Sequence, residues 1–144
     1  MITIPALKKK LTILLVEDEP MDVLVTKRYL YKSHIDNDLH IVTSGKEAIE
    51  FLLQKGEHQY SPKPDVIILD MGLPDLSGPE VMKKIRKNPS LRHIPIVILT
   101  GQPKEGDPIK KYHLFENSYV NKWMSMDEFL SLIKAVDDVR SSEP

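Results

Sequence analysis

The residues best suited to chemistry stand directly after short apolar runs of the sequence. Two acids follow the first run, another acid follows a later run, and a threonine and a lysine close two more: Glu17, Asp18, Asp70, Thr100 and Lys122. Carboxylates held about 4 Å apart repel each other by roughly 4 kcal/mol at an effective dielectric near 20. If the acids meet, one of them takes up a proton or a cation lies among them. Mg²⁺, a hard ion that prefers oxygen ligands, is the ordinary solution.

The threonine hydroxyl and the lysine ammonium would add a hydrogen-bond donor and a fixed cation to such a site. A metal, a carboxylate nucleophile and two groups that hold oxygens together describe a place where a phosphoryl group is received. Each residue taken alone has a simpler explanation as a helix cap, a strand-end hydroxyl or a surface lysine. The pattern favours function because all of them fall at the ends of predicted strands.

Apolar runs and helical patterns alternate along the chain, which predicts an α/β fold. The predicted strands span residues 11–16, 39–42, 65–70, 94–100 and 118–122. Helices are expected between them and after the last, with the second helix ending at Gly56 and the fourth starting near Asp107. Such βα units build a doubly wound parallel sheet with helices on both faces. Ligands bind at the carboxyl ends of the strands in this architecture, where the polar residues stand.

Composition excludes several other classes of protein. The 144 residues contain no cysteine, so disulfides, thiolate metal sites and cysteine nucleophiles are excluded. The formal net charge of -1 gives no reason to expect a nucleic-acid or membrane partner. No apolar run approaches the roughly 18–20 residues of a membrane span. The first residues do not have the order of a secretory signal, so we expect a cytoplasmic protein.

Four segments together resemble the receiver domain of two-component response regulators. "LVEDEP", "DVIILDMGLPDLSG", "PIVILTG" and "SYVNK" match, in order, its acidic pair, phosphoacceptor loop, hydroxyl strand and lysine strand. "FLLQKGEHQYSPKPDVIILDMGLP" and "NPSLRHIPIVILT" further resemble the stand-alone response regulators that accompany phytochromes of cyanobacteria and other bacteria. The resemblance implies a flavodoxin-like, five-stranded parallel sheet with strand order 2-1-3-4-5. It also implies a non-enzymatic single receiver domain over residues 1–144, with a core at about 11–139 and no output domain.

The resemblance assigns a role to each site residue. Asp70 would be the phosphoacceptor that takes a phosphoryl group from a sensor histidine kinase, with a phytochrome as the candidate kinase. Mg²⁺ would be held by the carboxylates of Glu17, Asp18 and Asp70 and by the backbone carbonyl of Gly72.

The same resemblance implies how the signal leaves the site. Thr100 and Lys122 would bind phosphoryl oxygens, and Tyr119 would pack inward as Thr100 moves. The surface of the fourth helix, fifth strand and last helix would then change shape and bind an unknown downstream protein. A homodimer through the fifth strand and last helix is a further expectation.

The chain departs from the family after the lysine, where Trp123 replaces the usual proline. A cis peptide bond before proline costs roughly 0.5–1 kcal/mol, but roughly 2.5–4 kcal/mol before any other residue. Either the Lys122–Trp123 bond carries that strain or it is trans and the loop takes another path. Trp123 therefore motivates an alternative function, a receiver-like interaction module that does not depend on phosphate.

Other functions are disfavoured by what the sequence lacks. A phosphatase that works through an aspartyl phosphate would need a general acid two residues after Asp70, where Gly72 stands. A nucleotide site would need a GxxxxGK loop after a strand, and none is present. DNA binding would need a basic face.

Overall fold

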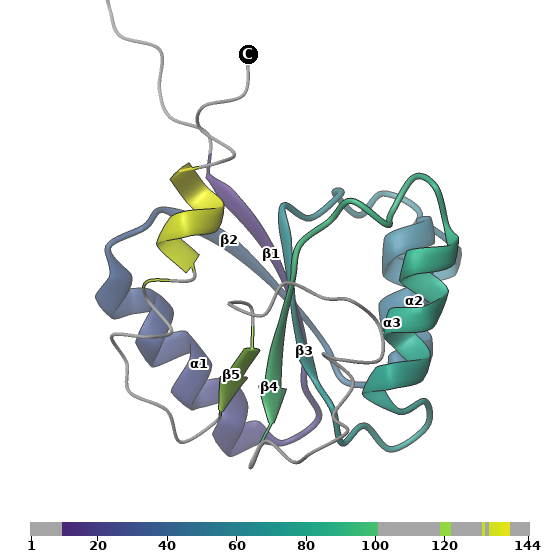
Figure 1. Cartoon of the computed structure of the whole chain (residues 1–144), viewed down its shortest axis with the longest axis horizontal. Helices are drawn as coiled ribbons and strands as arrows, with labels where there is room; N and C mark the ends of the chain where they lie inside the picture. The colour runs from purple at the N-terminus through teal and green to yellow at the C-terminus, as the bar shows by residue number, and fades with distance from the viewer. Residues whose placement is uncertain (1–9, 101–118, 122–130, 132, 139–144) are drawn as a thin grey trace, which may run out of the picture.

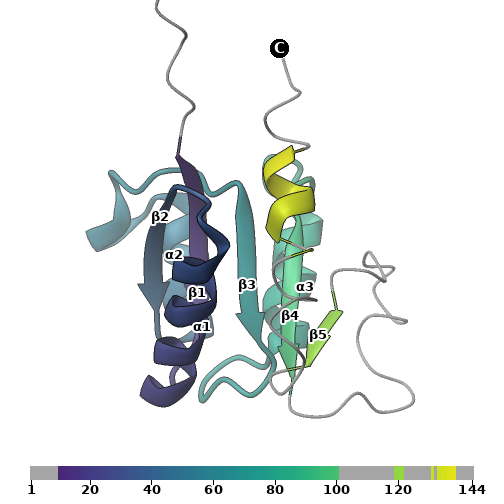
Figure 2. The ribbon, with the colours of Figure 1, turned by 90° about the vertical axis from the view of Figure 1, so that its left-hand side faces the viewer.

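The structure is a computed structural model that describes residues 10–100, 119–121, 131 and 133–138. Its five strands form one parallel sheet. They are β1 (Leu11–Val16), β2 (Asn37–Val42), β3 (Val66–Asp70), β4 (Ile96–Thr100) and β5 (Tyr119–Asn121). Their order is β2-β1-β3-β4-β5, as Figure 2 shows from left to right. The predicted fold class and strand order are confirmed.

The central strands are apolar along their whole length because both faces of the sheet are covered. Every residue of β1 and of β3 is buried, which is the pattern of a parallel sheet between two helical layers. The predicted strands match with small shifts at their starts: β2 begins at Asn37 rather than Leu39, and β4 begins at Ile96 rather than Ile94.

Two helical layers enclose the sheet. Helix α1 (Pro20–Ser33) and the helical residues 133–138 cover one face, and α2 (Gly45–Leu53) and α3 (Gly78–Lys87) cover the other (Figure 1). The period of two along β1 divides its side chains between two cores, with Leu14 in the α2–α3 core and Leu15 in the α1 core. Ile133, near the C-terminus, is buried in the α1 core, as its helical pattern predicts.

Side-chain caps fix where the helices begin. The hydroxyls of Ser44 and Ser77 accept the backbone N–H groups of Glu47 and Glu80 at 3.1 and 3.3 Å and so start α2 and α3. The predicted end of α2 at Gly56 is wrong. The helix ends at Leu53 because Gln54 adopts a left-handed conformation with φ 56°, and Gly56 instead opens the short 3₁₀ helix η1 (Gly56–His58).

Several predictions fall on parts of the chain outside the described residues. These include the fourth helix from Asp107, most of the closing helix, Lys122 and Trp123. Within the described ranges, no helix combines the length and the apolar character needed to cross a bilayer.

Candidate functional site

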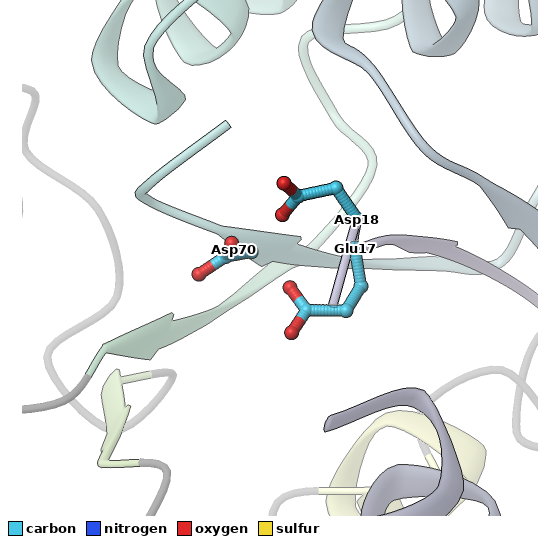
Figure 3. Close-up of side chains that lie close together, drawn as sticks. All are labelled: Glu17, Asp18 and Asp70. Carbon is cyan, nitrogen blue, oxygen red and sulfur yellow. The ribbon is translucent and has the colours of Figure 1, made fainter. Parts of the chain in front are cut away.

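The pairing of β1 with β3 brings the three predicted acids together. Val16 is paired with Leu69, so the residues that follow, Glu17 and Asp70, lie side by side at the carboxyl ends of these strands. Asp18 is the next residue along the β1–α1 loop. One carboxylate oxygen from each of the three residues lies within 4.8 Å of the other two, and the side chains converge on one space (Figure 3). The predicted meeting of Glu17, Asp18 and Asp70 is confirmed.

The three acids differ in their exposure to water. Glu17 is fully buried and Asp70 is only 5 % exposed, whereas Asp18 is exposed. Carboxylates are rarely buried close together unless a cation or strong hydrogen bonds compensate their charge. An all-oxygen donor set with one side open to water suits a hard divalent ion such as Mg²⁺, which keeps several of its waters. The chemistry of these side chains therefore fits the predicted cofactor.

The three consecutive acids of "EDE", residues 17–19, have different roles: two belong to the acidic cluster and one caps a helix. Glu17 is held at the sheet because its backbone N–H donates to the carbonyl of Val42 at 3.0 Å, which extends the pairing of β1 with β2 by one residue. Glu19 instead caps α1, since its carboxylate accepts the N–H of Met21 at 3.3 Å. Asp18, between them, contributes its carboxylate to the acidic cluster.

The loop that follows Asp70 is anchored to α2 by an aspartate that sequence reasoning missed. Asp75 accepts the backbone N–H groups of Gly45 and Lys46 at 2.8 and 2.9 Å, one with each carboxylate oxygen. Burial acts to raise the pKa of Asp75, but hydrogen bonds from the backbone of Lys46, Leu76 and Gly45 together hold that pKa below its ordinary value. The carboxylate thus supplies acceptors for the first turn of α2 from a distant part of the chain.

Close packing fixes the same loop. A Cβ atom added to Gly45 would lie 2.7 Å from Cβ of Leu76, so a side chain at Gly45 would push the loop away from α2. Gly72 differs, because an added Cβ atom there would meet no atom within 4 Å. Packing therefore gives no reason for glycine at position 72, and the ligand role of its carbonyl stays a prediction.

The remaining predicted residues are placed only in part. Thr100 is the last residue of β4 and follows Leu99, which is paired with Asp70, so its backbone reaches the same end of the sheet. Tyr119 starts β5 and is paired with Ile98. The side chains of Thr100 and Tyr119, and the whole of Lys122 and Trp123, lie outside what the structure describes.

Comparison with known proteins agrees with this geometry. Residues 13–134 match the family model of the response regulator receiver domain. The chain is 38% identical over 125 residues to response regulator Rcp1 of Synechocystis sp., a match that covers 87% of this chain and 85% of that protein. Rcp1 and RcpA, which are matched along most of their length, are named as response regulators.

Solved structures of similar sequence share the fold. The Mn²⁺-bound form of response regulator Rcp1 has a TM-score of 0.74 at 36% identity and covers 92% of this chain and 96% of its own. The phosphorylated cyanobacterial phytochrome response regulator RcpA reaches 0.76 at 31% identity, with coverage of 93% and 96%. The bacteriophytochrome response regulator RtBRR reaches 0.79 at 35% identity, with coverage of 89% and 78%. This chain therefore belongs to the response regulator receiver domain family and is similar to its phytochrome-associated members.

Proposed function

We propose that this protein is the phosphoacceptor of a two-component phosphorelay, in which a sensor histidine kinase transfers a phosphoryl group to Asp70. The observation that carries the proposal is the convergence of Glu17, Asp18 and Asp70, which each bring one carboxylate oxygen within 4.8 Å of the other two. Asp70 is the acid at the end of the central strand β3, where a group bound outside the sheet can be reached.

The reaction requires little of the protein beyond position and charge. An oxygen of Asp70 attacks the phosphorus of a phosphohistidine, the new P–O bond forms, and the P–N bond to the imidazole breaks. Glu17, Asp18, Asp70 and the Gly72 carbonyl are the residues that would hold Mg²⁺. When bound, this ion supplies positive charge against the phosphoryl oxygens. One relative has been solved in an Mn²⁺-bound form, which supports a divalent ion here.

The proposed reaction transmits its signal by changing the shape of one surface of the protein. The Thr100 hydroxyl and the Lys122 ammonium would bind oxygens of the new phosphoryl group, which adds negative charge and strong acceptors. Tyr119 would take the space that Thr100 leaves, and the surface around β5 and the last helix would change. Trp123 would change the direction in which the Lys122 side chain points, since it replaces the proline that usually follows this lysine.

The partners proposed for the protein follow from its relatives. RcpA and RtBRR are named as phytochrome and bacteriophytochrome response regulators, which supports a phytochrome-type sensor kinase as the donor. We further propose a single receiver domain over residues 1–144, with its core at about 11–139, in the cytoplasm. A homodimer and an unidentified downstream protein complete the proposal.

The test is intact mass after incubation with Mg²⁺ and acetyl phosphate, with rapid quenching. One added phosphoryl group is expected on the wild type and on Asp65→Asn, a matched control at the other end of β3. Asp70→Asn should gain none while its circular dichroism stays unchanged. A phosphoryl group on Asp70→Asn would contradict the assignment of the nucleophile. No adduct on folded wild type would favour the phosphate-independent interaction module that Trp123 suggests.

A further inference from the structure

A groove is lined by residues of α2, of α3 and of the loop after β3. Both helices cover the same face of the sheet (Figure 1). The volume of the groove is about 240 Å³. Half-buried aliphatic side chains form its floor: Ile49 and Leu53 from α2, and Leu76 from the loop after β3. All three also pack against the α2–α3 core, so the floor is supported from below. The groove is separate from the acidic cluster, and none of its lining residues belongs to that cluster.

The rim of the groove is basic. Lys46, Lys55 and Lys84 surround the floor, and Glu50 is the single acid among the lining residues. Among the described residues, the ion pairs of His40 with Asp38 and of His58 with Glu47 involve none of the rim lysines. The chain as a whole carries a formal charge of -1, so this positive rim is a local feature.

We propose that this groove binds a short acidic segment of a partner protein. An aliphatic side chain of the segment lies on the floor, and carboxylates on either side of it pair with the rim lysines. Charge complementarity selects an acidic partner, and the apolar floor selects a segment with a hydrophobic residue at its centre. A volume of about 240 Å³ is below the roughly 300–1,000 Å³ of pockets that enclose small ligands, and it suits one or two side chains. The lining contains no aromatic ring on which a nucleic-acid base could stack.

The groove is connected to the loop that follows Asp70. Leu76 forms part of the floor and lies one residue after Asp75, whose carboxylate accepts the N–H of Lys46, a rim residue. A bound segment therefore touches both sides of the contact that anchors the loop to α2. If the loop moves on phosphorylation, the affinity of the groove for the acidic segment changes as well. By the same coupling, a bound segment changes how readily Asp70 is phosphorylated. This second step rests on the proposed function, whereas the binding itself does not.

The experiment uses the full chain, labelled with ¹⁵N, and the blocked pentapeptide Glu-Asp-Leu-Asp-Glu. We expect saturable changes of amide chemical shift in α2, α3 and the loop around Leu76, weaker at high salt. Control peptides are Glu-Asp-Ser-Asp-Glu, which lacks the apolar residue, and Lys-Lys-Leu-Lys-Lys, which has the wrong charge. Absence of a saturable shift with the acidic peptide at about 10 mM and low salt overturns the proposal.

Two charge reversals on one helix make the test specific. Lys84→Glu should weaken binding about fivefold or more, since it replaces an attraction by a repulsion. Lys83→Glu, on an exposed neighbour that does not line the groove, should weaken binding less than about twofold. Equal weakening by both variants would mean a diffuse attraction to the surface and would overturn the site. Lys84→Gln provides a neutral variant if the reversal affects folding.

The coupling is read separately, from the rate at which acetyl phosphate modifies the wild type with and without saturating peptide. A changed rate supports the coupling, and an unchanged rate in a protein that binds the peptide rejects the coupling alone. Failure of Asp70 to accept phosphate would contradict the proposed function. The shift titration would still decide whether the groove binds.

Discussion

Two aspartates lie at the two ends of β3, and their surroundings give them different roles. Asp65 directly precedes β3 and Asp70 ends it. The carboxylate of Asp65 accepts the backbone N–H of Thr12 at 2.8 Å, and the N–H of Asp65 donates to the carbonyl of Thr12 at 2.8 Å. Asp70 instead lies at the opposite end of the strand, close to the carboxylates of Glu17 and Asp18.

The comparison shows that the neighbours of a carboxylate, and not its place beside a strand, decide what it does. The backbone N–H of Thr12 donates to the carboxylate of Asp65, so this residue stabilises the contact between β1 and the start of β3. Other carboxylates raise the electrostatic energy around Asp70, so this end of the strand favours a bound cation. Asp75 resembles Asp65, since it also accepts backbone N–H groups, but it does so within the loop that follows Asp70.

The largest expected difference between the two ends of β3 is the response to Mg²⁺. An ion present at 100 times its Kd stabilises the folded state by about 2.7 kcal/mol. We expect Asp65→Asn to keep this gain and Asp70→Asn to retain less than about 1 kcal/mol of it, because a ligand is lost. Without Mg²⁺, Asp70→Asn should be more stable than the wild type, since one of three neighbouring charges is gone.

Urea unfolding with Mg²⁺ and with a chelator measures both effects. The two variants remove the same charge from opposite ends of β3, so each controls for the other. An equal gain from Mg²⁺ in both would remove Asp70 from the ligand set.

The sequence predicted this acidic cluster because it depends on two simple regularities. Apolar runs mark the buried strands, and the carboxyl ends of neighbouring parallel strands meet at one edge of the sheet. Glu17, Asp18 and Asp70 therefore had to come close once the order of β1 and β3 was known.

Asp75 and the end of α2 could not be predicted in the same way. The contact of Asp75 with Gly45 spans 30 residues, and nothing in "GLPDLSG" says which helix receives the carboxylate. Gln54 ends α2 in a left-handed conformation that glycine usually adopts, although Gly56 stands two residues later. A tertiary contact decides which helix Asp75 caps. The left-handed conformation of Gln54 goes against the usual preference for glycine, so the local residue pattern does not record it.

Asp65→Ala tests the structural end of the strand. It leaves the buried N–H of Thr12 without its carboxylate acceptor, so we expect the free energy of unfolding to fall by about 2 kcal/mol. Asp65→Asn should lose much less, since its amide oxygen can still accept this hydrogen bond. Phosphorylation by acetyl phosphate should stay normal in both. A loss of phosphorylation in folded Asp65→Ala would mean that the two ends of β3 are not independent.

Asp75→Asn should give the smallest loss in the free energy of unfolding, and this loss should depend on pH. The amide retains one acceptor oxygen, so we expect a loss of about 0.5–1 kcal/mol at pH 7. The folded-state pKa of Asp75 is lowered, so its carboxylate contributes stability above the ordinary pKa and loses it as pH falls through the folded value. The stability difference between wild type and variant should therefore shrink below about pH 4. Urea midpoints at pH 7, 5 and 3 measure it, and a difference that stays constant would mean that the charge of Asp75 does not help to hold the loop on α2.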